Sequence, residues 1–585
     1  MAARSSGPVP SRSWCPDQRS TPLPAPVSAV PSEQVFSQNH SPLQVFTPLP
    51  ENTLLATRLA GREEMGDTYR FTVGLIARSG TRIDISALVG AFAGVQLTLP
   101  GGVTRAYHGI IAEFWQEDGD QVFDRYTMVL RPRIALLELV KRSRVFQSQS
   151  ANQIFSTLLE PLKTPDGWQT QSFITPLPTR VYCTQYRETD LQFLRRLCSE
   201  SGVTYFWTHT PQNHCITLTD NTSIQAQALG TIPYKPQAGG TVDGTVISSW
   251  RVGQKVCPAG VQVVGSQYQI FNQELQSTWP VPASVQAGTL KLNTVQGIAP
   301  WQQDELSASR FFDSVTPSGG EDSAAVTSMY NTQVTQSGVG ARAAAAGSVR
   351  AFATGNCCQL TPGHSFRLTG HPNQDGDWLV VAADHTVEVE GRFWAGEPSA
   401  LRAEVRAECA PLSLRQAIWP FLPRPAIAGV LTGIVIGPEG SEIFIDKYGR
   451  VQVRFWWDRD NPSTSCWIRV AQSWAGNGWG ACFWPRVGHE VVVSFENGDP
   501  DRPVIIGSVY NSTNMPPYAL PSNQYIAGWK SLTQGGDPSR NYHQIFMSDE
   551  SDAAVVHIHA ESMFIANQEA QQVTQRPVLS IDQQG

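Results

Sequence analysis

Charge and long apolar runs are scarce in this sequence. Only 16% of the 585 residues are charged, against roughly 25% in a typical soluble protein, which indicates that other proteins cover much of the surface. The net charge of −7 excludes a strongly basic nucleic-acid binder and gives no reason to expect binding to an anionic membrane. No run of about 18 apolar residues occurs, and the N-terminus lacks the apolar segment of a secretory signal. We therefore predict neither a transmembrane helix nor an ordinary signal peptide.

Paired cysteines and catalytic motifs are also lacking. The ten cysteines are scattered, without CxxC pairs of zinc-like spacing, so we predict mostly buried, reduced thiols in a chain that folds in the cytosol. No GxSxG, HExxH or P-loop string occurs. We therefore predict no catalytic residue, no cofactor-binding residue, no metal ligand and no cofactor.

Glycine (48), proline (41) and tryptophan (17) are plentiful, which favours β-rich structure with many turns. The length predicts roughly three or four domains. Residues 1–45 are rich in proline and serine and bury too little apolar surface to offset their chain entropy, so we predict disorder there. Short apolar runs such as Tyr69–Ile76, Val95–Leu99 and Tyr126–Leu130 predict an antiparallel, barrel-like region over about 46–135.

Two helices are predicted from their capping residues. Ser150 can cap a helix whose apolar face holds Ile154, Phe155, Leu158 and Leu159. Thr189 and Gln192 form a capping-box pair, and Gly202 supplies a C-terminal stop for a second helix. Its apolar stripe consists of Leu191, Leu194, Leu197 and Cys198. Strands are predicted at Val203–Trp207 and within Leu368–His385.

A proline-rich linker is predicted at 418–427. Beyond it, apolar and polar residues alternate in Arg450–Phe455 and Glu490–Phe495, and a further strand is predicted at Val504–Ile506. Strands at this spacing indicate a small barrel. A final strand is predicted at Ala553–His559.

Several strings of residues occur together and in order. The first is Arg187-Glu188-Thr189-Asp190, preceded by Gln185-Tyr186 and followed by Gly202 to Trp207. The others are His108-Gly109-Ile110, Leu130 to Arg133, Ser143 to Gln147, Leu368 to Pro372, Asp446 to Asp458 (DKYGRVQVRFWWD), Ser465 to Val470, Trp474 to Gly480, Pro485 to Gly488, Gly498 to Pro503 and Asn514 to Pro521. Together they resemble the VgrG family, the valine-glycine-repeat spike proteins of type VI secretion, which are related to the hubs and needles of contractile-tailed phages.

The resemblance implies a mainly β fold with some α-helix (α+β), with phage-hub-like β-barrel domains, an OB-fold domain and the start of an intertwined trimeric β-prism. The segments it implies are a disordered extension (1–45), a phage-hub-like domain of the late control protein D type (46–417), a linker (418–427), an OB-fold domain (428–512) and a connecting loop with a short β-prism (513–585).

The function that the resemblance implies is mechanical rather than enzymatic. A homotrimer would cap the hexameric tube protein (Hcp type), carry a PAAR-type tip protein and effector or adaptor proteins, and puncture a target membrane. It would assemble in the bacterial cytoplasm and leave the cell through the type VI apparatus without a signal peptide, and nucleic acid is not an expected partner. The alternatives are the hub of a prophage or extracellular contractile tail, which genomic neighbours would distinguish, and a cell-wall-degrading enzyme, which a zymogram would detect.

The residues of the C-terminal region favour a trimer independently of the resemblance. About 70 residues there contain too little apolar material for a core of their own, and neither a disulfide nor a metal site is evident. Their strands would leave exposed edges unless other chains pair with them. Three chains around one axis would remove the edges and create a core at once.

Two candidate ligand sites have simpler structural explanations. His557 and His559 share one face of a strand, and three chains would bring six imidazoles together. However, Val556 and Ile558 on the other face suit a prism core better, which places the histidines outside and makes metal binding the minority interpretation. The glycines of Gly476 to Gly480 precede strand-like residues rather than a helix, which favours a turn over a phosphate loop. Trp474 and Trp479 beside them are predicted to be packing or interface residues.

Acid–base or nucleophilic chemistry receives little support from the remaining candidates. Glu113 and Glu117 are placed in a β-rich turn region, where nothing fixes their separation. Glu63-Glu64 and Asp499 with Asp501 are predicted to be solvated turn residues. Cys183 and Cys198 are predicted to be core residues rather than nucleophiles.

Overall fold

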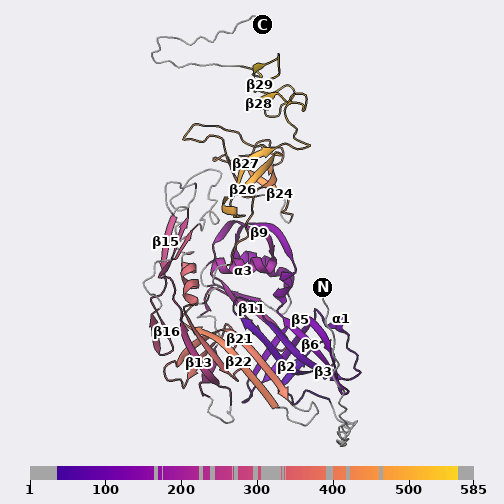
Figure 1. The fold of residues 1–585 in the computed structure, drawn as a ribbon, viewed down its shortest axis with the longest axis vertical. Helices are drawn as coiled ribbons and strands as arrows, with labels where there is room; N and C mark the ends of the chain where they lie inside the picture. The colour runs from indigo at the N-terminus through magenta and orange to yellow at the C-terminus, as the bar shows by residue number, and fades with distance from the viewer. Residues whose placement is uncertain are drawn as a thin grey trace, which may run out of the picture.

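The computed structural model describes residues 36–563, except for 164–168, 174–175, 223–227, 237–243, 266–267, 269–274, 294–300, 305–330, 332–334, 336–337, 391–399, 415, 417–421 and 460–464. Three predicted segments lie partly or wholly outside the described residues: residues 1–35 of the extension, residues 418–421 of the linker and the polar segment after residue 563. Figure 1 shows the chain in tiers along its long axis, with a large β region at one end, a five-stranded sheet beyond it and a small C-terminal sheet farthest out.

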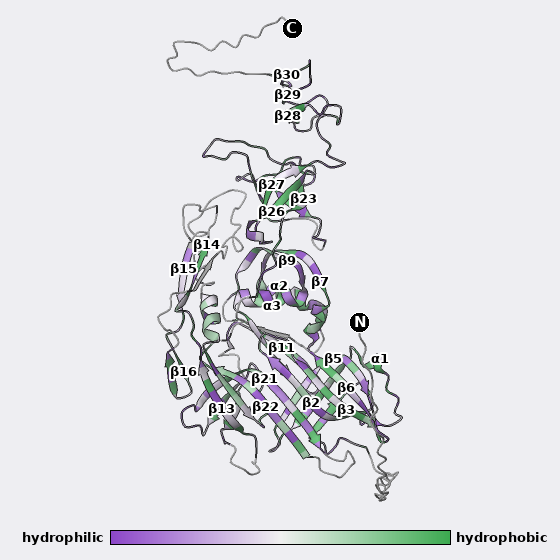
Figure 2. Ribbon diagram, in the orientation of Figure 1, coloured by the Kyte–Doolittle hydropathy of each residue, from purple (hydrophilic) through white to green (hydrophobic). Residues whose placement is uncertain are grey.

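The large sheet has 12 strands drawn from distant parts of the sequence. Along its main path the order is β1 (Leu43–Phe46), β4 (Phe92–Thr98), β5 (Thr104–Glu117), β6 (Phe123–Arg131), β3 (Arg70–Arg78), β2 (Leu55–Glu64), β21 (Gly376–Glu390), β22 (Ala400–Pro411), β19 (Val349–Gly355) and β13 (Ile247–Gln254), with β20 (Ser365–Thr369) and β12 (Ala228–Pro233) joined beside β21. Hydrophilic and hydrophobic residues alternate along β2, β21 and β22 (Figure 2), as expected for strands with one face on a core.

The antiparallel strands predicted over 46–135 are confirmed, and β2 also pairs with β21, which joins this region to strands much later in the sequence. One sequence prediction needs correction here. Residues 36–45 were predicted to be disordered, yet Phe36 is buried beside Ile76, and the amide side chain of Gln38 bonds both backbone groups of Val45. The averaged proline and serine content hid these two anchoring side chains.

Both predicted helices are confirmed. Helix α2 (Ala151–Leu159) begins after Ser150, and helix α3 (Asp190–Ser201) begins after Thr189, each with a reciprocal capping box. Gly202 ends α3 in the left-handed conformation with φ 67°, which glycine adopts without a Cβ clash. The predicted stripes of both helices are buried.

A two-stranded ribbon and a small sheet surround these helices. The ribbon pairs β7 (Lys141–Ser150) with β9 (Thr179–Thr189), and the sheet has the order β10 (Thr204–His209), β11 (His214–Thr219), β8 (Gln169–Ser172). The structure also describes α1 (Ile85–Leu88) and the 3-10 turns Arg133–Glu138, Glu160–Leu162 and Glu496–Gly498. A three-stranded sheet has the order β15 (Leu275–Pro280), β14 (Gly260–Gly265), β18 (Trp301–Asp304), and a hairpin pairs β16 (Ser284–Ala287) with β17 (Leu290–Asn293).

We predict that Thr189→Ala destabilises helix α3 by about 1 kcal/mol. The Thr189 hydroxyl oxygen accepts from the Gln192 backbone N–H at 3.1 Å, and the Gln192 side-chain oxygen accepts from the Thr189 N–H at 2.9 Å. Native-state hydrogen exchange of residues 190–201 should show the loss, and Thr189→Ser, which retains the hydroxyl, should recover it. Equal destabilisation by both variants would contradict the capping explanation.

The five-stranded sheet has the order β24 (Gln452–Phe455), β23 (Leu431–Ile436), β26 (Glu490–Phe495), β27 (Pro503–Val509), β25 (Arg469–Val470). The alternation predicted from sequence is confirmed, because Val451, Val453, Val491 and Val493 are buried in one cluster. Residues 422–427 of the predicted linker have no regular secondary structure.

The C-terminal sheet is an antiparallel meander of β28 (Ile526–Lys530), β29 (Gln544–Ser548) and β30 (Val555–His559) within one chain. Its register places Trp529, Ile545 and Ile558 directly across from one another, with Met547 and Val556 beside them. These side chains are between 46% and 68% exposed. The sheet therefore presents an apolar face that the described residues of this chain leave uncovered.

Among the described residues, no helix is long and apolar enough to cross a membrane. Of the described cysteines, Cys183, Cys198, Cys257, Cys357, Cys358 and Cys409 are buried and free, Cys215 and Cys466 are partly buried, and Cys482 is exposed. The prediction of mostly buried thiols is confirmed for this part of the chain.

Candidate functional site

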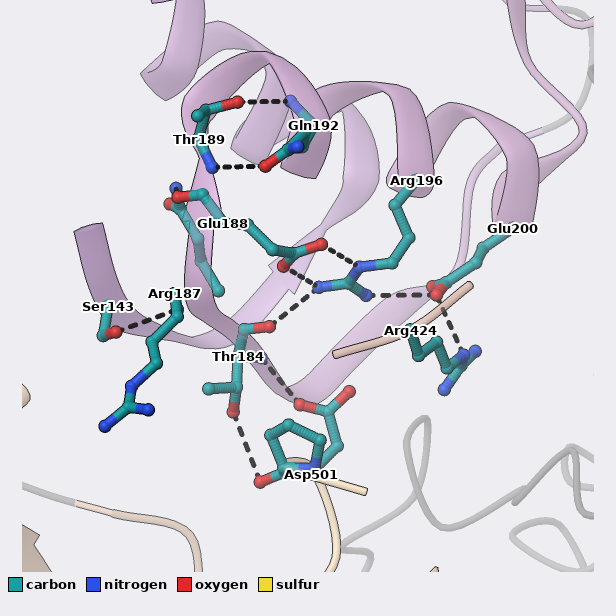
Figure 3. Close-up of polar contacts among 12 residues, drawn as sticks. Ser143, Thr184, Arg187, Glu188, Thr189, Gln192, Arg196, Glu200, Arg424 and Asp501 are labelled. Carbon is teal, nitrogen blue, oxygen red and sulfur yellow. Dashed lines mark hydrogen bonds and ion pairs between the residues drawn. The ribbon is translucent and has the colours of Figure 1, made fainter. Parts of the chain in front are cut away.

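Residues from several of the sequence strings meet where two parts of the structure touch (Figure 3). One part is the ribbon β7–β9 with helix α3, and the other is the five-stranded sheet. We call this contact the joint. Ribbon strand β9 runs alongside the turn between β26 and β27. The backbone N–H of Thr184 donates to the Asp501 carboxylate at 2.7 Å, and its hydroxyl lies 3.4 Å from the Pro500 carbonyl oxygen. These bonds join residues more than 300 positions apart in the chain.

An apolar contact reinforces the joint. Tyr186 of β9 is only 7% exposed and belongs to the core of the five-stranded sheet. Its ring meets the edge of Trp457 at a centroid distance of 5.6 Å, a favourable arrangement for two aromatic rings. The next residue, Arg187, has a positive φ of 51° and donates its backbone N–H to the Ser143 hydroxyl at 3.0 Å. This strained turn aims Tyr186 into the neighbouring sheet.

A buried charge network lies behind these contacts. The guanidinium of Arg196, 2% exposed, binds both carboxylate oxygens of Glu188 at 2.8 Å and one oxygen of Glu200 at 3.1 Å. It also donates to the Thr184 carbonyl oxygen at 2.9 Å. Burial opposes the Arg196 charge, but the adjacent carboxylates hold the pKa of its guanidinium well above its usual value. The Arg196 guanidinium is therefore charged at all ordinary pH values.

Glu200 connects this network to the linker. Its carboxylate also pairs with Arg180 at 2.6 Å and with Arg424 of the linker at 3.0 Å. Arg424 in turn lies 3.7 Å from Asp499 in the turn of the five-stranded sheet. Helix α3, the linker and the five-stranded sheet thus share one set of ion pairs. Because these ion pairs join the linker to the parts on both sides of it, the joint resists relative rotation of the parts that it connects.

The remaining residues of the Arg187-Glu188-Thr189-Asp190 string tie the ribbon to the helix. Thr189 caps α3. Asp190, 2% exposed, accepts from Arg142 at 2.9 Å and Arg144 at 3.3 Å, both on β7. The string therefore builds a rigid support rather than a reactive centre.

Two family comparisons and one relative identify the chain. The family described as "Phage tail baseplate hub (GPD)" matches residues 62–391, and the family described as "Type VI secretion system/phage-baseplate injector OB domain" matches residues 445–510. The type VI secretion system spike protein VgrG1a of Pseudomonas aeruginosa is 32% identical over 526 residues, which cover 89% of this chain and 77% of that protein. The chain belongs to the VgrG family. It is a type VI secretion system spike protein, and its five-stranded sheet is the OB domain.

Solved structures agree with this VgrG fold. An Escherichia coli type VI secretion component with structural similarity to the T4 phage tail proteins gp27 and gp5 superimposes with a TM-score of 0.52 at 18% identity, covering 80% of this chain and 99% of that chain. A chain of a Francisella PdpA–VgrG complex superimposes with a TM-score of 0.50 at 8% identity, covering 88% of each chain. At these identities the similarity concerns the fold alone.

Two pairs of acidic residues in this VgrG chain were assigned wrongly from sequence. Glu63 was predicted to be solvated but is 1% exposed in β2, where it binds Arg105 at 2.6 Å and His385 at 3.0 Å. Glu64 beside it is partly exposed and pairs with Arg62. Asp499 and Asp501, predicted to be solvated turn residues, belong to the joint described above.

The remaining carboxylates and thiols lie apart from the joint or inside the core. Glu113 and Glu117 lie in strand β5 rather than in a turn, and Glu113 pairs with Arg70 at 2.6 Å. Cys183 and Cys198 are core residues, as predicted. Burial raises the pKa of the Cys183 thiol to about 12 and that of Cys198 further, so neither thiol ionises readily.

The histidine and glycine candidates of the VgrG chain take no part in the contacts of that joint. His557 and His559 share the face of β30 opposite Val556 and Ile558, as predicted, with their rings parallel at 6.4 Å. Within the described residues, no group of three or more His, Cys, Asp or Glu side chains is placed to hold a metal ion.

The glycine segment forms a turn between β25 and β26. Gly476 donates its N–H to the Trp479 carbonyl oxygen at 2.8 Å, and Gly478 has a φ of 80°. Trp474 and Trp479 stand edge to face at 5.0 Å and are 64% and 59% exposed. Residues 481–484, predicted to be strand-like, are not in a strand. The turn therefore holds two aromatic rings on the surface of the OB domain, as expected for interface residues.

Proposed function

We propose that this VgrG protein works as a homotrimer that caps the secretion tube and transmits force to its tip without any chemical step. The observation that supports this proposal is the exposed apolar face of β28–β30. A contiguous apolar face that is exposed to water marks a site of contact with other protein chains. Three copies around one axis would bury these faces against one another and form a β-prism.

The proposed domain boundaries follow from the same reasoning. The hub domain would span 46–417, although Phe36 already packs against this region, and the OB domain would span 428–512. Residues 513–585 would form the connecting loop and the short prism. The joint would carry the load between hub and OB domain, because Arg424 of the linker pairs with Glu200 of helix α3 on one side and with Asp499 of the OB domain on the other.

The proposed partners are a hexameric tube protein beneath the hub, a PAAR-type protein at the tip, and an effector or adaptor at the C-terminal end. The Francisella VgrG forms a complex with PdpA, which supports the idea that spikes of this fold carry other proteins. The trimer would assemble in the bacterial cytoplasm and leave through the type VI apparatus. The alternative of a phage-tail hub is not retained, because the chain is 32% identical to the secretion spike VgrG1a.

The mass of the full chain in solution tests the trimer. Multi-angle light scattering of the purified protein should give three times the chain mass of 64.1 kDa, with no dependence on dilution through the micromolar range. A protease-resistant particle with the mass of one chain would overturn the proposal.

A further inference from the structure

Four buried histidines gather between the large sheet and the turn that joins β10 to β11. His108 lies on β5, His209 and His214 flank the turn, and His385 lies on β21. His108 and His214 are each 3% exposed, His385 is 1% exposed, and the side chain of His209 is fully buried. They belong neither to the joint described above nor to the apolar face of the C-terminal sheet.

Hydrogen bonds link His214 to His108 and His108 to His209, and a longer contact joins His209 to Glu63. His214 and His108 share a bond between their Nδ1 atoms at 2.9 Å. The backbone N–H of His108 donates to His209 Nδ1 at 3.2 Å, and His209 Nε2 faces Glu63 Oε2 at 3.7 Å. On the other side of Glu63, His385 Nε2 lies 3.0 Å from Oε1, and its Nδ1 lies 3.3 Å from the Tyr107 hydroxyl.

Backbone donors fix the protons on three of these rings. The N–H of Arg133 donates to His214 Nε2 at 3.1 Å, so His214 must carry its proton on Nδ1 and donate it to His108 Nδ1. His108 then carries its own proton on Nε2. Because His209 Nδ1 accepts from the His108 N–H, His209 carries its proton on Nε2. Each of the three rings uses one nitrogen as an acceptor, which requires the neutral form.

A second proton on any of these three rings would set two donors against each other. On His214 it would face the Arg133 N–H, on His209 the His108 N–H, and on His108 the Nδ1–H of His214. A donor facing a donor in a buried site loses the bond and leaves both groups unsatisfied. The geometry therefore resists protonation of all three.

Most of the surrounding charges also disfavour protonation of the three histidine rings. Arg133 faces His108 and His214, and Arg105 lies near His209. Burial, His209 and Arg133 lower the pKa of His108 to about 4. Burial likewise lowers the pKa of His214 well below its usual value, and that of His209 despite the attraction of Glu63.

Glu63 stays ionised within this cluster. Burial opposes its charge, but Arg105 and its bonds to His209 and His385 hold the pKa of Glu63 well below its usual range. Three further titratable side chains face the cluster, and all three are neutral: Tyr69, Tyr107 and His364. Burial raises the pKa of both tyrosines and lowers that of His364.

We propose that His108, His209 and His214 form an acid-sensitive latch that holds the β10–β11 turn against the large sheet at neutral pH and releases it on acidification. The turn is Thr210–Asn213, closed by the Thr210 N–H to Asn213 carbonyl bond at 2.8 Å. Farther along β10 from the turn, Trp207 donates to the Asp67 carbonyl oxygen at 3.1 Å, and the Tyr205 carbonyl oxygen accepts from the Gly66 N–H at 2.7 Å. This second anchor does not titrate, so acid frees the turn without detaching the whole hairpin.

The pH range follows from the direction of the shifts. Opening exposes the three rings, whose pKa in water is about 6.5. Since the closed state holds them neutral, opening takes up protons below about pH 6.5, and the closed state loses stability as the pH falls toward 4. Each ring changes the opening equilibrium by up to about tenfold per pH unit in this range.

Hydrogen exchange of the full chain at pH 7.5, 6 and 5 tests the latch. After correction for intrinsic exchange rates, protection of residues 208–216 should fall by about 100- to 1000-fold between pH 6 and 5, because two to three protons are taken up. Protection of β21 and β22 should fall far less. In the variant His108→Asn with His209→Asn, which keeps an acceptor oxygen near each Nδ1 position but cannot be protonated, the fall should shrink to about tenfold.

Further variants keep the outcome decisive. His40→Asn changes an exposed histidine and should leave the pH dependence unaltered. If the double variant does not fold, the single variant His209→Asn should lower the number of protons taken up from about three to about two. An unchanged pH dependence in a folded variant, or equal loss of protection throughout the large sheet, would overturn the latch.

Discussion

Replacing Arg196 with methionine should lower the local stability of helix α3 by about 3–5 kcal/mol. The variant keeps most of the apolar stem of the side chain but removes the charge that Glu188 and Glu200 share. Glu200 retains Arg180 and Arg424, whereas both oxygens of Glu188 lose a bond of 2.8 Å. A buried carboxylate without its partner carries most of the cost, because removing one member of a buried pair is more harmful than removing both.

Native-state hydrogen exchange of residues 190–201 measures this loss directly, since global unfolding of a chain with several domains is not two-state. The matched control is Arg195→Met, at the neighbouring position. The Arg195 guanidinium is 30% exposed and pairs with Asp67 at 3.2 Å, so its loss should cost no more than about 1 kcal/mol. Adding Glu188→Gln to Arg196→Met should recover part of the stability. Equal, small effects of Arg196→Met and Arg195→Met would show that the network contributes little.

The parts of the fold that were predicted correctly depend on residues close together in the sequence. The capping box of Thr189 and Gln192 and the stop at Gly202 lie within one helix, so their spacing alone indicated both ends of α3. The alternation in Glu490–Phe495 likewise determined which side chains face the OB core. Such patterns need no knowledge of the tertiary structure.

The assignment of Glu63 failed for the opposite reason. Its partners Arg105 and His385 lie 42 and 322 positions away, and no local pattern marks a carboxylate that will be buried by distant strands. A carboxylate next to another carboxylate is usually solvated, and that expectation was wrong here. The histidines of the proposed latch were missed for the same reason, because His108 and His214 meet only through the packing of β11 on β5.

Only one side of the joint could be predicted from the sequence. The Arg187-Glu188-Thr189-Asp190 string was recognised through its resemblance to VgrG proteins, but nothing in the string indicated that Thr184 would bond Asp501. Asp499 and Asp501 follow a glycine and flank a proline, which is typical of an exposed turn. The turn is instead covered by the neighbouring domain, where Asp501 binds Thr184 and Asp499 pairs with Arg424.

In the C-terminal sheet, the period-two pattern correctly placed Val556 and Ile558 on the face away from the histidines. The partner of that face belongs to another chain in the proposed trimer.

Replacing Ile545 and Ile558 together with aspartate should convert the proposed trimer to single chains. The two residues lie directly across from each other, beside Trp529, in the middle of the apolar face. Six carboxylates would then enter one trimer core, and each buried, unpaired charge costs several kcal/mol.

The matched control for this double variant is Ser548→Asp, which adds a carboxylate to the opposite face of the same sheet. Light scattering should give the mass of one chain for Ile545→Asp with Ile558→Asp, and three chains for both Ser548→Asp and the unaltered protein. Circular dichroism should show that the hub and OB strands remain folded in all three, since their cores do not include the C-terminal sheet. A double variant that keeps the mass of the unaltered trimer would show that this face lies outside the contact between chains.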